Sequence, residues 1–165
     1  MQYWWVSHNK TFEYEFSDGF LWSPKTKSNG QNNKFYSNMC EVNIDDIIFS
    51  FAKSHIQAVG TATSTAFEKE KPKEFKESDN NWDSNGWQLN VKFEKLPHKI
   101  LPKDHCSEIK ATLPDKYSPL NKQNCNGLQG VYLTCVPENM AQVLIEIMGQ
   151  EYSNIVKMLR NSSGL

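Results

Sequence analysis

The sequence predicts an α+β domain built on a small β-barrel with flanking helices. Runs of alternating or β-branched apolar residues recur along most of the chain, and such runs are typical of half-buried strands. Apolar residues at helical spacing follow towards the carboxyl end, after Pro137. A length of 165 residues suits a single hydrophobic core, so we expect one globular domain.

The first half of the chain predicts mostly extended structure. In TFEYEF, residues 11–16, aromatic residues alternate with glutamates, which indicates a strand or extended arm with one apolar face. Gly60 lies inside a predicted hairpin, where it permits a bulge or a close approach. The expected elements are a strand at 2–7, a strand or arm at 11–16, a helical turn at 35–42, and hairpin strands at 47–51 and 56–65.

The second half predicts one long alternating strand and the helices. The mixed-charge run at 68–81 contains a proline and indicates a solvated loop. In the segment 86–96 the apolar residues Trp87, Leu89, Val91 and Phe93 share one face, so that face of a strand is expected to be buried. The remaining expected elements are a helix within 102–114, a polar loop at 118–129, a buried strand at 130–136, a helix from Pro137 to Gly149 and a second helix from 151.

Composition narrows the possible function classes. A hydrophobic content of 38% and a mean hydropathy of -0.64 describe a polar globular protein, and no apolar run approaches the roughly 20 residues of a membrane span. The start of the chain lacks the basic and apolar regions of a signal peptide, so we expect a cytoplasmic location. With a net charge of -1, nucleic acid would have to bind through a local patch.

The four cysteines do not form a metal-binding pattern. Cys40, Cys106, Cys125 and Cys135 are far apart in sequence and match no C-x-x-C spacing. A zinc site using His105 and Cys106 is the alternative, but adjacent residues rarely bind one ion and no second close pair completes a tetrahedron. We therefore expect reduced, mostly buried thiols, and no metal or cofactor in this domain.

Four segments together resemble a known family. They are YWWVSHNKTFEYEF…FLWSPK, FYSNMCEVNIDDIIFSF…IQAVGTA, NWDSNGWQLNVKFEKL and SPLNKQNCNGLQGVYL. Their order and spacing, over most of residues 1–150, resemble the EVE domain of the PUA superfamily, as found in EVE-HNH modification-dependent restriction endonucleases. The resemblance implies a PUA-like barrel that reads 5-methylcytosine or 5-hydroxymethylcytosine in DNA by flipping the base out of the stack.

The resemblance also implies a domain organisation. Residues 1–150 would be the reader, and residues 151–165 would start a helical linker towards an HNH nuclease that this chain does not contain. The chain itself is therefore expected to bind and not to catalyse. Its implied partners are DNA with modified cytosine and, in the full-length protein, a C-terminal nuclease domain through which it could dimerise. A divalent metal is expected only for that nuclease, and no membrane partner is expected.

A flipped pyrimidine needs a narrow slot with flat apolar walls. Trp82 lies in a loop of small polar residues, where it would serve either as a stacking platform or as a loop anchor folded onto the barrel. Pro24 is either a turn residue or, beside Trp82 in the family pattern, the second wall. Tyr132 alternates with apolar neighbours and points either into the pocket or into the core. Trp22 is a weaker pocket candidate, and Ser23, Asp83 and Ser84 are the candidates for hydrogen bonds to the base edge.

Phosphate contacts supply most of the affinity for DNA, so cations should flank the slot. Lys25, Lys27 and Lys34 surround an amide-rich loop that includes Asn33, and we predict that they contact the DNA backbone. Each lysine could instead be merely solvated. The predicted patch extends to Lys53, Lys122 and Gln123.

Three other function classes compete with this interpretation. A reader of a methylated base in single-stranded RNA, similar to YTH domains, would use the same kind of aromatic pocket. A hydrolase is disfavoured because there is no G-x-S-x-G or H-E-x-x-H motif, and because His55 and His105 are distant in sequence. A protein-interaction barrel would not need an amide-rich cationic rim around exposed aromatics.

Overall fold

The computed structural model describes residues 1–75 and 85–161. Its strands are β1 (Tyr3–Ser7), β2 (Phe20–Pro24), β3 (Ile47–Ala52), β4 (His55–Ala62), β5 (Phe67–Glu70), β6 (Asn85–Ile100) and β7 (Leu133–Val136). The helices are α1 (Phe12–Asp18), α2 (Lys34–Ser37), α3 (Cys106–Ile109), α4 (Glu138–Met148) and α5 (Gln150–Asn161). Short 3₁₀ turns occupy Asn38–Glu41, Lys73–Phe75, Pro102–His105 and Lys110–Thr112. No helix within these residues is long and apolar enough to cross a membrane.

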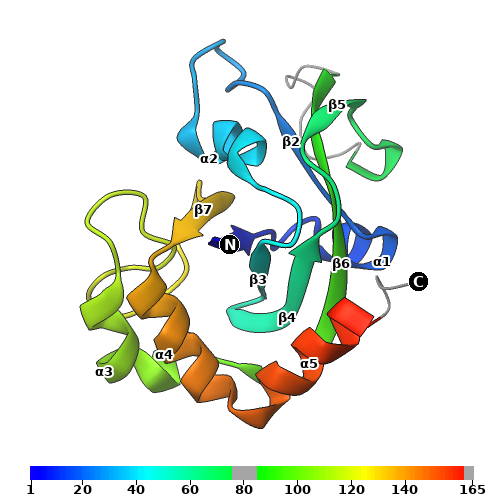
Figure 1. The fold of residues 1–165 in the computed structure, drawn as a ribbon. Coiled ribbons are helices and arrows are strands. Elements are labelled where there is room, and N and C mark those ends of the chain that lie inside the picture. The colour runs from blue at the N-terminus through cyan, green and yellow to red at the C-terminus, as the bar shows by residue number, and fades with distance from the viewer. Residues whose placement is uncertain (76–84, 162–165) are drawn as a thin grey trace.

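The strands form one strongly curled sheet in the order β2-β6-β4-β3-β1-β7, with β5 also paired to β6 (Figure 1). The first part of β6 pairs with β2, and its remainder pairs with β4, so this one long strand carries the sheet around the barrel. At the crossing of β4 and β6, a β-carbon on Gly60 would collide with the side chains of Val91 and Phe93. The close approach predicted at Gly60 is therefore confirmed.

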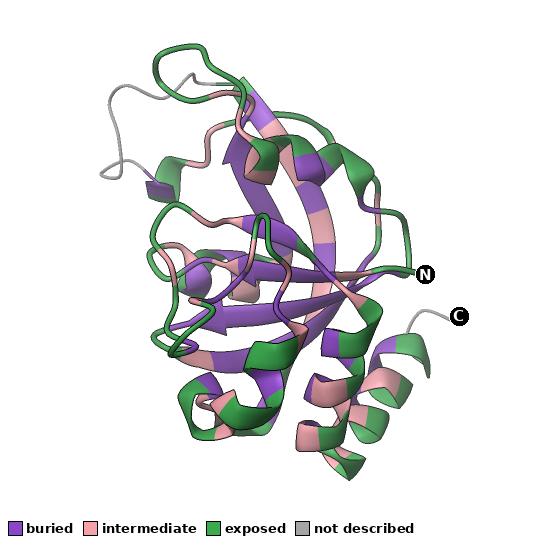
Figure 2. Ribbon diagram, turned by 90° about the vertical axis from the view of Figure 1, so that its left-hand side faces the viewer, coloured by how far each residue is buried: buried purple, intermediate pink, exposed green. Residues whose placement is uncertain are grey.

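Alternate residues of the central strands enter two different cores. Trp5 and Phe49 pack with Met140, Leu144 and other residues of α4 and α5 on one side of the sheet. Trp4, Val6 and Ile48, together with Leu89 and Val91, fill the interior of the half-barrel. Figure 2 shows buried residues along the strands, whereas the helices alternate buried and exposed surfaces. The α+β architecture predicted from the sequence is thus confirmed.

The segment predicted as a strand at 11–16 is instead helix α1, so that prediction was wrong. Phe12, Glu15 and Phe16 lie three and four residues apart, and Phe12 and Glu15 are buried while Phe16 is partly buried. Over six residues, an alternating pattern and a helical pattern fit almost equally well. Gly19 ends the helix in the left-handed conformation, at φ 74°, and its N–H bonds to the Glu15 carbonyl.

The solvated loop predicted at 68–81 also needs correction within its described part. Phe67–Glu70 forms β5 along β6, with all four residues exposed, so the polar composition suits an edge strand. Phe75 is buried against Phe20 and Trp22. A single aromatic residue in a charged run is thus an anchor that holds this segment against β2.

The cysteine prediction was wrong. Cys106 and Cys125 form a disulfide with their Cα atoms 5.7 Å apart, and Cys40 and Cys135 are exposed thiols. The pairing arises because the polar loop before β7 folds back onto the helical segment that starts at Pro102. Among the described residues, no group of three or more His, Cys, Asp or Glu side chains could hold a metal ion.

Candidate functional site

A cavity of about 770 Å³ opens where the ends of β1 and β2, the β3–β4 turn and the segment 125–132 meet. Its lining includes Trp22, Ser23, Pro24 and Tyr132. The structure therefore brings four of the predicted pocket residues to one place, although they are up to 110 positions apart in sequence. The other three, Trp82, Asp83 and Ser84, lie outside the described residues. The roles assigned to all seven stay predictions.

The apolar wall of this cavity is rigidly held. Trp22 is only 2% exposed, its Nε1–H donates to the Lys69 carbonyl at 3.0 Å, and its ring meets Phe75 edge to face at 5.9 Å. A β-carbon on Gly86 of β6 would collide with the Trp22 ring and with the Ser23 carbonyl oxygen. The close packing of β2 on β6 therefore requires glycine at position 86.

Four lining residues, His8, Thr11, Trp22 and Tyr132, share one partner behind the cavity wall: the carboxylate of Glu15, which is 0% exposed and does not itself line the cavity. It accepts hydrogen bonds from Thr11 Oγ1 at 2.7 Å and from the Trp22 backbone N–H at 2.8 Å. It also accepts from the Tyr132 hydroxyl at 2.5 Å, and His8 Nδ1 lies 2.9 Å away. An ionised carboxylate has about four acceptor positions, so the four neighbours satisfy it completely.

The network defines proton positions on its members. Because an ionised carboxylate only accepts, His8 Nδ1 carries a proton, and His8 Nε2 bonds to the Ser50 hydroxyl at 2.6 Å. Burial raises the pKa of Tyr132 well above its ordinary value, and the negative charge of Glu15 raises it further. Tyr132 is therefore a neutral phenol that donates to Glu15.

Tyr132 also closes the half-barrel. Its hydroxyl accepts a hydrogen bond from the Trp22 N–H at 3.1 Å, and its backbone carbonyl accepts from Ser7 N–H at 2.7 Å. β2 and β7 stand at the two ends of the strand order, and Tyr132 immediately precedes β7. The link from Tyr132 to Trp22 and Glu15 thus joins the two outer parts of the sheet beside the cavity and fixes the tyrosine ring in its wall.

Neither His8 nor Glu15 was predicted from the sequence to belong to the site. Glu15 was assigned to the polar face of a strand, and His8 had no distinguishing neighbour in sequence. The available signal was the helical spacing of Phe12, Glu15 and Phe16, which places the carboxylate on the apolar face. A glutamate on such a face needs buried partners.

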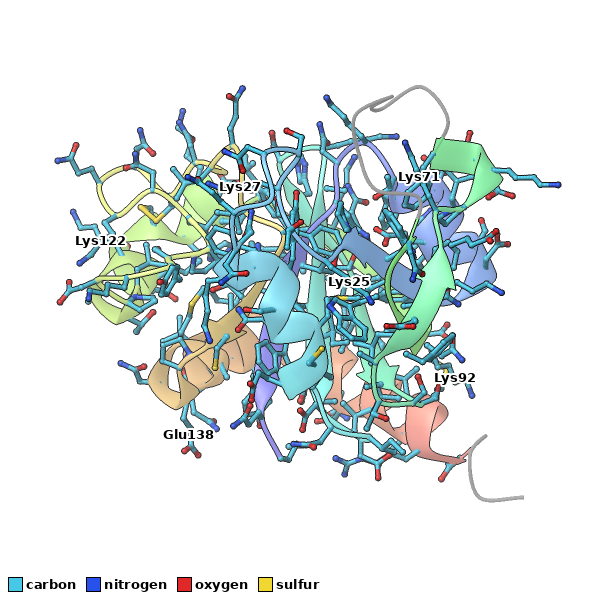
Figure 3. All side chains as sticks on the ribbon, turned by 90° about the horizontal axis from the view of Figure 1, so that it is seen from above. Lys25, Lys27, Lys71, Lys92, Lys122 and Glu138 are labelled. Carbon is cyan, nitrogen blue, oxygen red and sulfur yellow. A yellow bond between two sulfur atoms is a disulfide. The ribbon has the colours of Figure 1, made fainter. Side chains whose placement is uncertain are left out.

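The cations predicted to contact DNA are spread over the molecule. In Figure 3, Lys122 lies at one side of the molecule, and Lys27 and Lys25 lie nearer its middle. The Lys25 ammonium bonds to Glu68 and lies 4.7 Å from the centre of the Trp87 ring, and Lys122 bonds to Asp115. Of the predicted set, Lys53 is the residue that lines the cavity within the described chain.

The remaining predicted contacts lie outside the cavity lining. Lys34 borders a second hollow of about 580 Å³, and Asn33 caps α2 by accepting from the Phe35 N–H at 2.8 Å. Lys27 and Gln123 are exposed in loops. Their contacts with DNA stay predictions.

Solved structures from several organisms share the fold, among them the following three. A hypothetical protein from Leishmania major aligns at a TM-score of 0.62 and 10% identity, over 92% of this chain and 97% of its own. Human THYN1 in complex with 5-methylcytosine-containing DNA aligns at 0.56 and 11%, over 90% and 98%. The Pho92 YTH domain in complex with m6A aligns at 0.54 and 10%, over 89% and 85%. The fold is PUA-like.

Identities this low establish the PUA-like fold alone and not a shared ligand. No family model matches the sequence, and no curated protein matches it. The PUA-like barrel expected from the sequence is thus confirmed at the level of three-dimensional structure.

Proposed function

We propose that this chain is a reader of modified cytosine in DNA, and that it holds a flipped 5-methylcytosine or 5-hydroxymethylcytosine in the cavity beside Tyr132. The observation that carries the proposal is the cavity itself, with Trp22, Pro24 and Tyr132 in its wall and a fully satisfied hydrogen-bond network beneath. The likeness to human THYN1, whose structure contains 5-methylcytosine DNA, supports this choice of ligand.

The cavity has the properties that a base pocket needs. Its volume lies within the roughly 300–1,000 Å³ typical of small-ligand sites. Trp22, Pro24 and Tyr132 contribute flat side chains to the wall, and Tyr132, the one of the three that is only half-buried, offers the accessible face for a planar base. The walls are held by hydrogen bonds to the protein, so binding would require little ordering of these side chains.

Recognition of the base edge falls to groups other than Glu15 and His8, because their hydrogen-bonding positions are occupied by neighbours. Ser23 is the strongest described candidate. Ser23 lines the cavity but is only 1% exposed, and its hydroxyl donates to the Pro24 carbonyl at 2.9 Å. Its remaining lone pairs would accept from the exocyclic amino group of cytosine once the base fills the cavity. In this hydrogen bond the base would be the donor and the Ser23 hydroxyl the acceptor.

We further propose that the chain is a binding module without nuclease activity. In the full-length protein it would direct a linked HNH endonuclease to modified DNA in the cytoplasm, with residues 151–165 as the start of the linker and dimerisation through the nuclease. α5 buries Ile155 and Leu159 in the core, so a linker would begin from a helix anchored on the barrel. The purified chain, incubated with modified DNA and Mg²⁺, should leave the DNA uncleaved.

The deciding experiment is a fluorescence-polarisation assay with duplexes that differ at a single cytosine, which is unmodified, methylated or hydroxymethylated. We expect tighter binding to both modified duplexes. Trp82→Ala should weaken binding to the modified duplexes by roughly 1–3 kcal/mol, the value of one base–aromatic stack, and affect the unmodified duplex less. Equal affinity for all three duplexes would overturn the proposal.

One alternative has a specific observation in its favour. The fold is also shared with the Pho92 YTH domain, whose structure contains m6A. A single-stranded RNA containing methylated adenine therefore belongs in the same assay. Preference for this RNA over methylcytosine DNA would assign the chain to that second class.

A further inference from the structure

The mouth of the cavity has a one-sided charge. Lys10, Lys53 and Lys103 line it, and no carboxylate from the described residues does. The whole chain is close to neutral, with a net charge of -1, so this concentration of cations does not reflect the general composition. It marks one face of the cavity as attractive to anions.

The three lysines come from three separate segments. Lys10 lies in the turn between β1 and α1, Lys53 in the β3–β4 turn, and Lys103 in the 3₁₀ turn that begins at Pro102. All three side chains are exposed. The cluster does not come from a local run of basic residues. Only the folded chain brings these three positions to one opening.

Lys53 adopts a backbone conformation that lysine rarely takes. Lys53 and the following Ser54 have φ of 53° and 67°, in a two-residue hairpin turn that favours Asn-Gly. The Asn9 side chain holds this turn by accepting from the Lys53 N–H at 2.6 Å. Both Asn9 and Lys53 line the cavity. The two residues with positive φ therefore lie at the mouth of the cavity, and sparsely populated backbone conformations cluster at ligand sites.

The cations at the mouth are available to a ligand. Within the described residues, Lys10 and Lys103 make no ion pair, and Lys53 makes one solvent-exposed pair with Glu13 at 3.1 Å. Such a pair is weak and easily exchanged. Lys25, by contrast, already bonds to Glu68 and contacts the Trp87 ring.

We infer that Lys10, Lys53 and Lys103, here called the lysine rim, bind the phosphates that flank the base in the cavity. The site would then take its base as part of a phosphodiester strand, and the strand would cross the mouth of the cavity between the turns that carry these lysines. This inference rests on the proposed base-reading function. It differs from the sequence-based prediction in placing the backbone at Lys10 and Lys103.

The first test removes two rim charges. Lys10→Ala/Lys103→Ala should weaken binding to modified and unmodified duplexes by the same factor, on the order of tenfold, and flatten the salt dependence by about two units. The matched control, Lys99→Ala/Lys157→Ala, removes the same charge from exposed positions outside the cavity lining and should change neither quantity by more than a small fraction of this. Equal effects of the two pairs would refute a specific rim.

Lys53 is tested separately, because its backbone conformation matters. Lys53→Asn removes the charge and keeps a residue that tolerates positive φ, so the turn should remain folded. We expect a salt dependence flatter by about one unit, compared with no change for Lys99→Ala. Glu13→Gln should strengthen DNA binding more than Glu146→Gln, which makes the same charge change at an exposed position of α4. An unchanged salt slope for Lys53→Asn would exclude Lys53 from the rim.

A ligand series separates the rim from the base pocket. The probes are 5-methyl-2′-deoxycytidine, its 5′-monophosphate, and an oligonucleotide containing the same base. At low salt the monophosphate should bind several-fold more tightly than the nucleoside, and the rim variants should abolish this gain. Equal binding of nucleoside and monophosphate would refute the rim while the base pocket stands. Failure of all three probes to bind the wild-type chain would refute the base-reading proposal itself.

Discussion

The hydroxyl of Tyr132 donates a 2.5 Å hydrogen bond to the carboxylate of Glu15, across 117 positions of sequence. This bond joins α1 to the segment that leads into β7, and the same hydroxyl accepts from the Trp22 N–H of β2. One phenol therefore connects three elements at the point where the sheet would otherwise stay open. The wall of the proposed base pocket and the closure of the barrel depend on the same contact.

The Glu15 network predicts a large loss of stability for a conservative change. Glu15→Gln replaces one acceptor oxygen by an NH₂ group that faces existing donors. We expect the free energy of unfolding to fall by about 3 kcal/mol, because a buried polar network would be left partly unsatisfied. Urea denaturation measures the loss.

The control for this variant lies on the same helix. Glu13 is exposed and pairs with Lys53 at the surface, so Glu13→Gln should change the free energy of unfolding by less than about 1 kcal/mol. Equal stability of the Glu15 and Glu13 variants would contradict the role assigned to the network.

Stability should decline at high pH. The pKa of Tyr132 is raised well above its usual value by burial and by Glu15, and burial raises the pKa of Tyr152 to about 12. An unfolded tyrosine releases its proton near pH 10, so above that pH the unfolded state binds fewer protons than the folded state. The stabilisation is complete below about pH 10 and is lost as the pH rises towards the folded-state pKa values.

Two measurements check this pH dependence. Phenolate absorbance should show late deprotonation for the folded protein, with one late step missing in Tyr132→Phe. The free energy of unfolding should fall less steeply above pH 10 in that variant. A wild-type unfolding free energy that stays constant from pH 9 to 11.5 would show that these phenols titrate alike in both states.

The apolar pocket sets a moderate limit on selectivity. Burial of one methyl group contributes about 0.8 kcal/mol, and good packing doubles this at most. We therefore expect methylcytosine to be preferred over cytosine by roughly fourfold to twentyfold in the duplex assay. Hydroxymethylcytosine should also bind if its hydroxyl meets water or a polar group. A preference on the order of a thousandfold would require a site that actively rejects cytosine.

The disulfide should contribute measurably to stability. Cys106 and Cys125 are 19 positions apart, and closure of a loop of this length stabilises a protein by about 3 kcal/mol. Cys106→Ser/Cys125→Ser should lose about this amount in urea denaturation. Cys40→Ser/Cys135→Ser, which alters two exposed thiols, should leave the curve in place. If reducing agent does not shift the wild-type midpoint, the two sulfurs are not bonded in solution.

Local patterns in the sequence determined most of the regular elements. The hairpin of β3 and β4 follows from two apolar runs around a short turn, and the buried face of β6 follows from strict alternation at Leu89 and Val91. α4 begins directly after Pro137 and ends before Gly149, and these two residues had predicted its two ends. The signals for β6 and α4 are reliable because strand and helix periods differ clearly over ten or more residues.

Tertiary structure alone decided the features that build the site. Six residues around Glu15 fit a strand or a helix, and the helix prevails because it buries a carboxylate among donors from His8, Trp22 and Tyr132. Likewise, only the folded chain brings Lys10 and Lys103 to one opening. The physical reason is the same in both cases. A buried charge and a charged rim depend on partners that are distant in sequence, and closure of the sheet determines which partners meet.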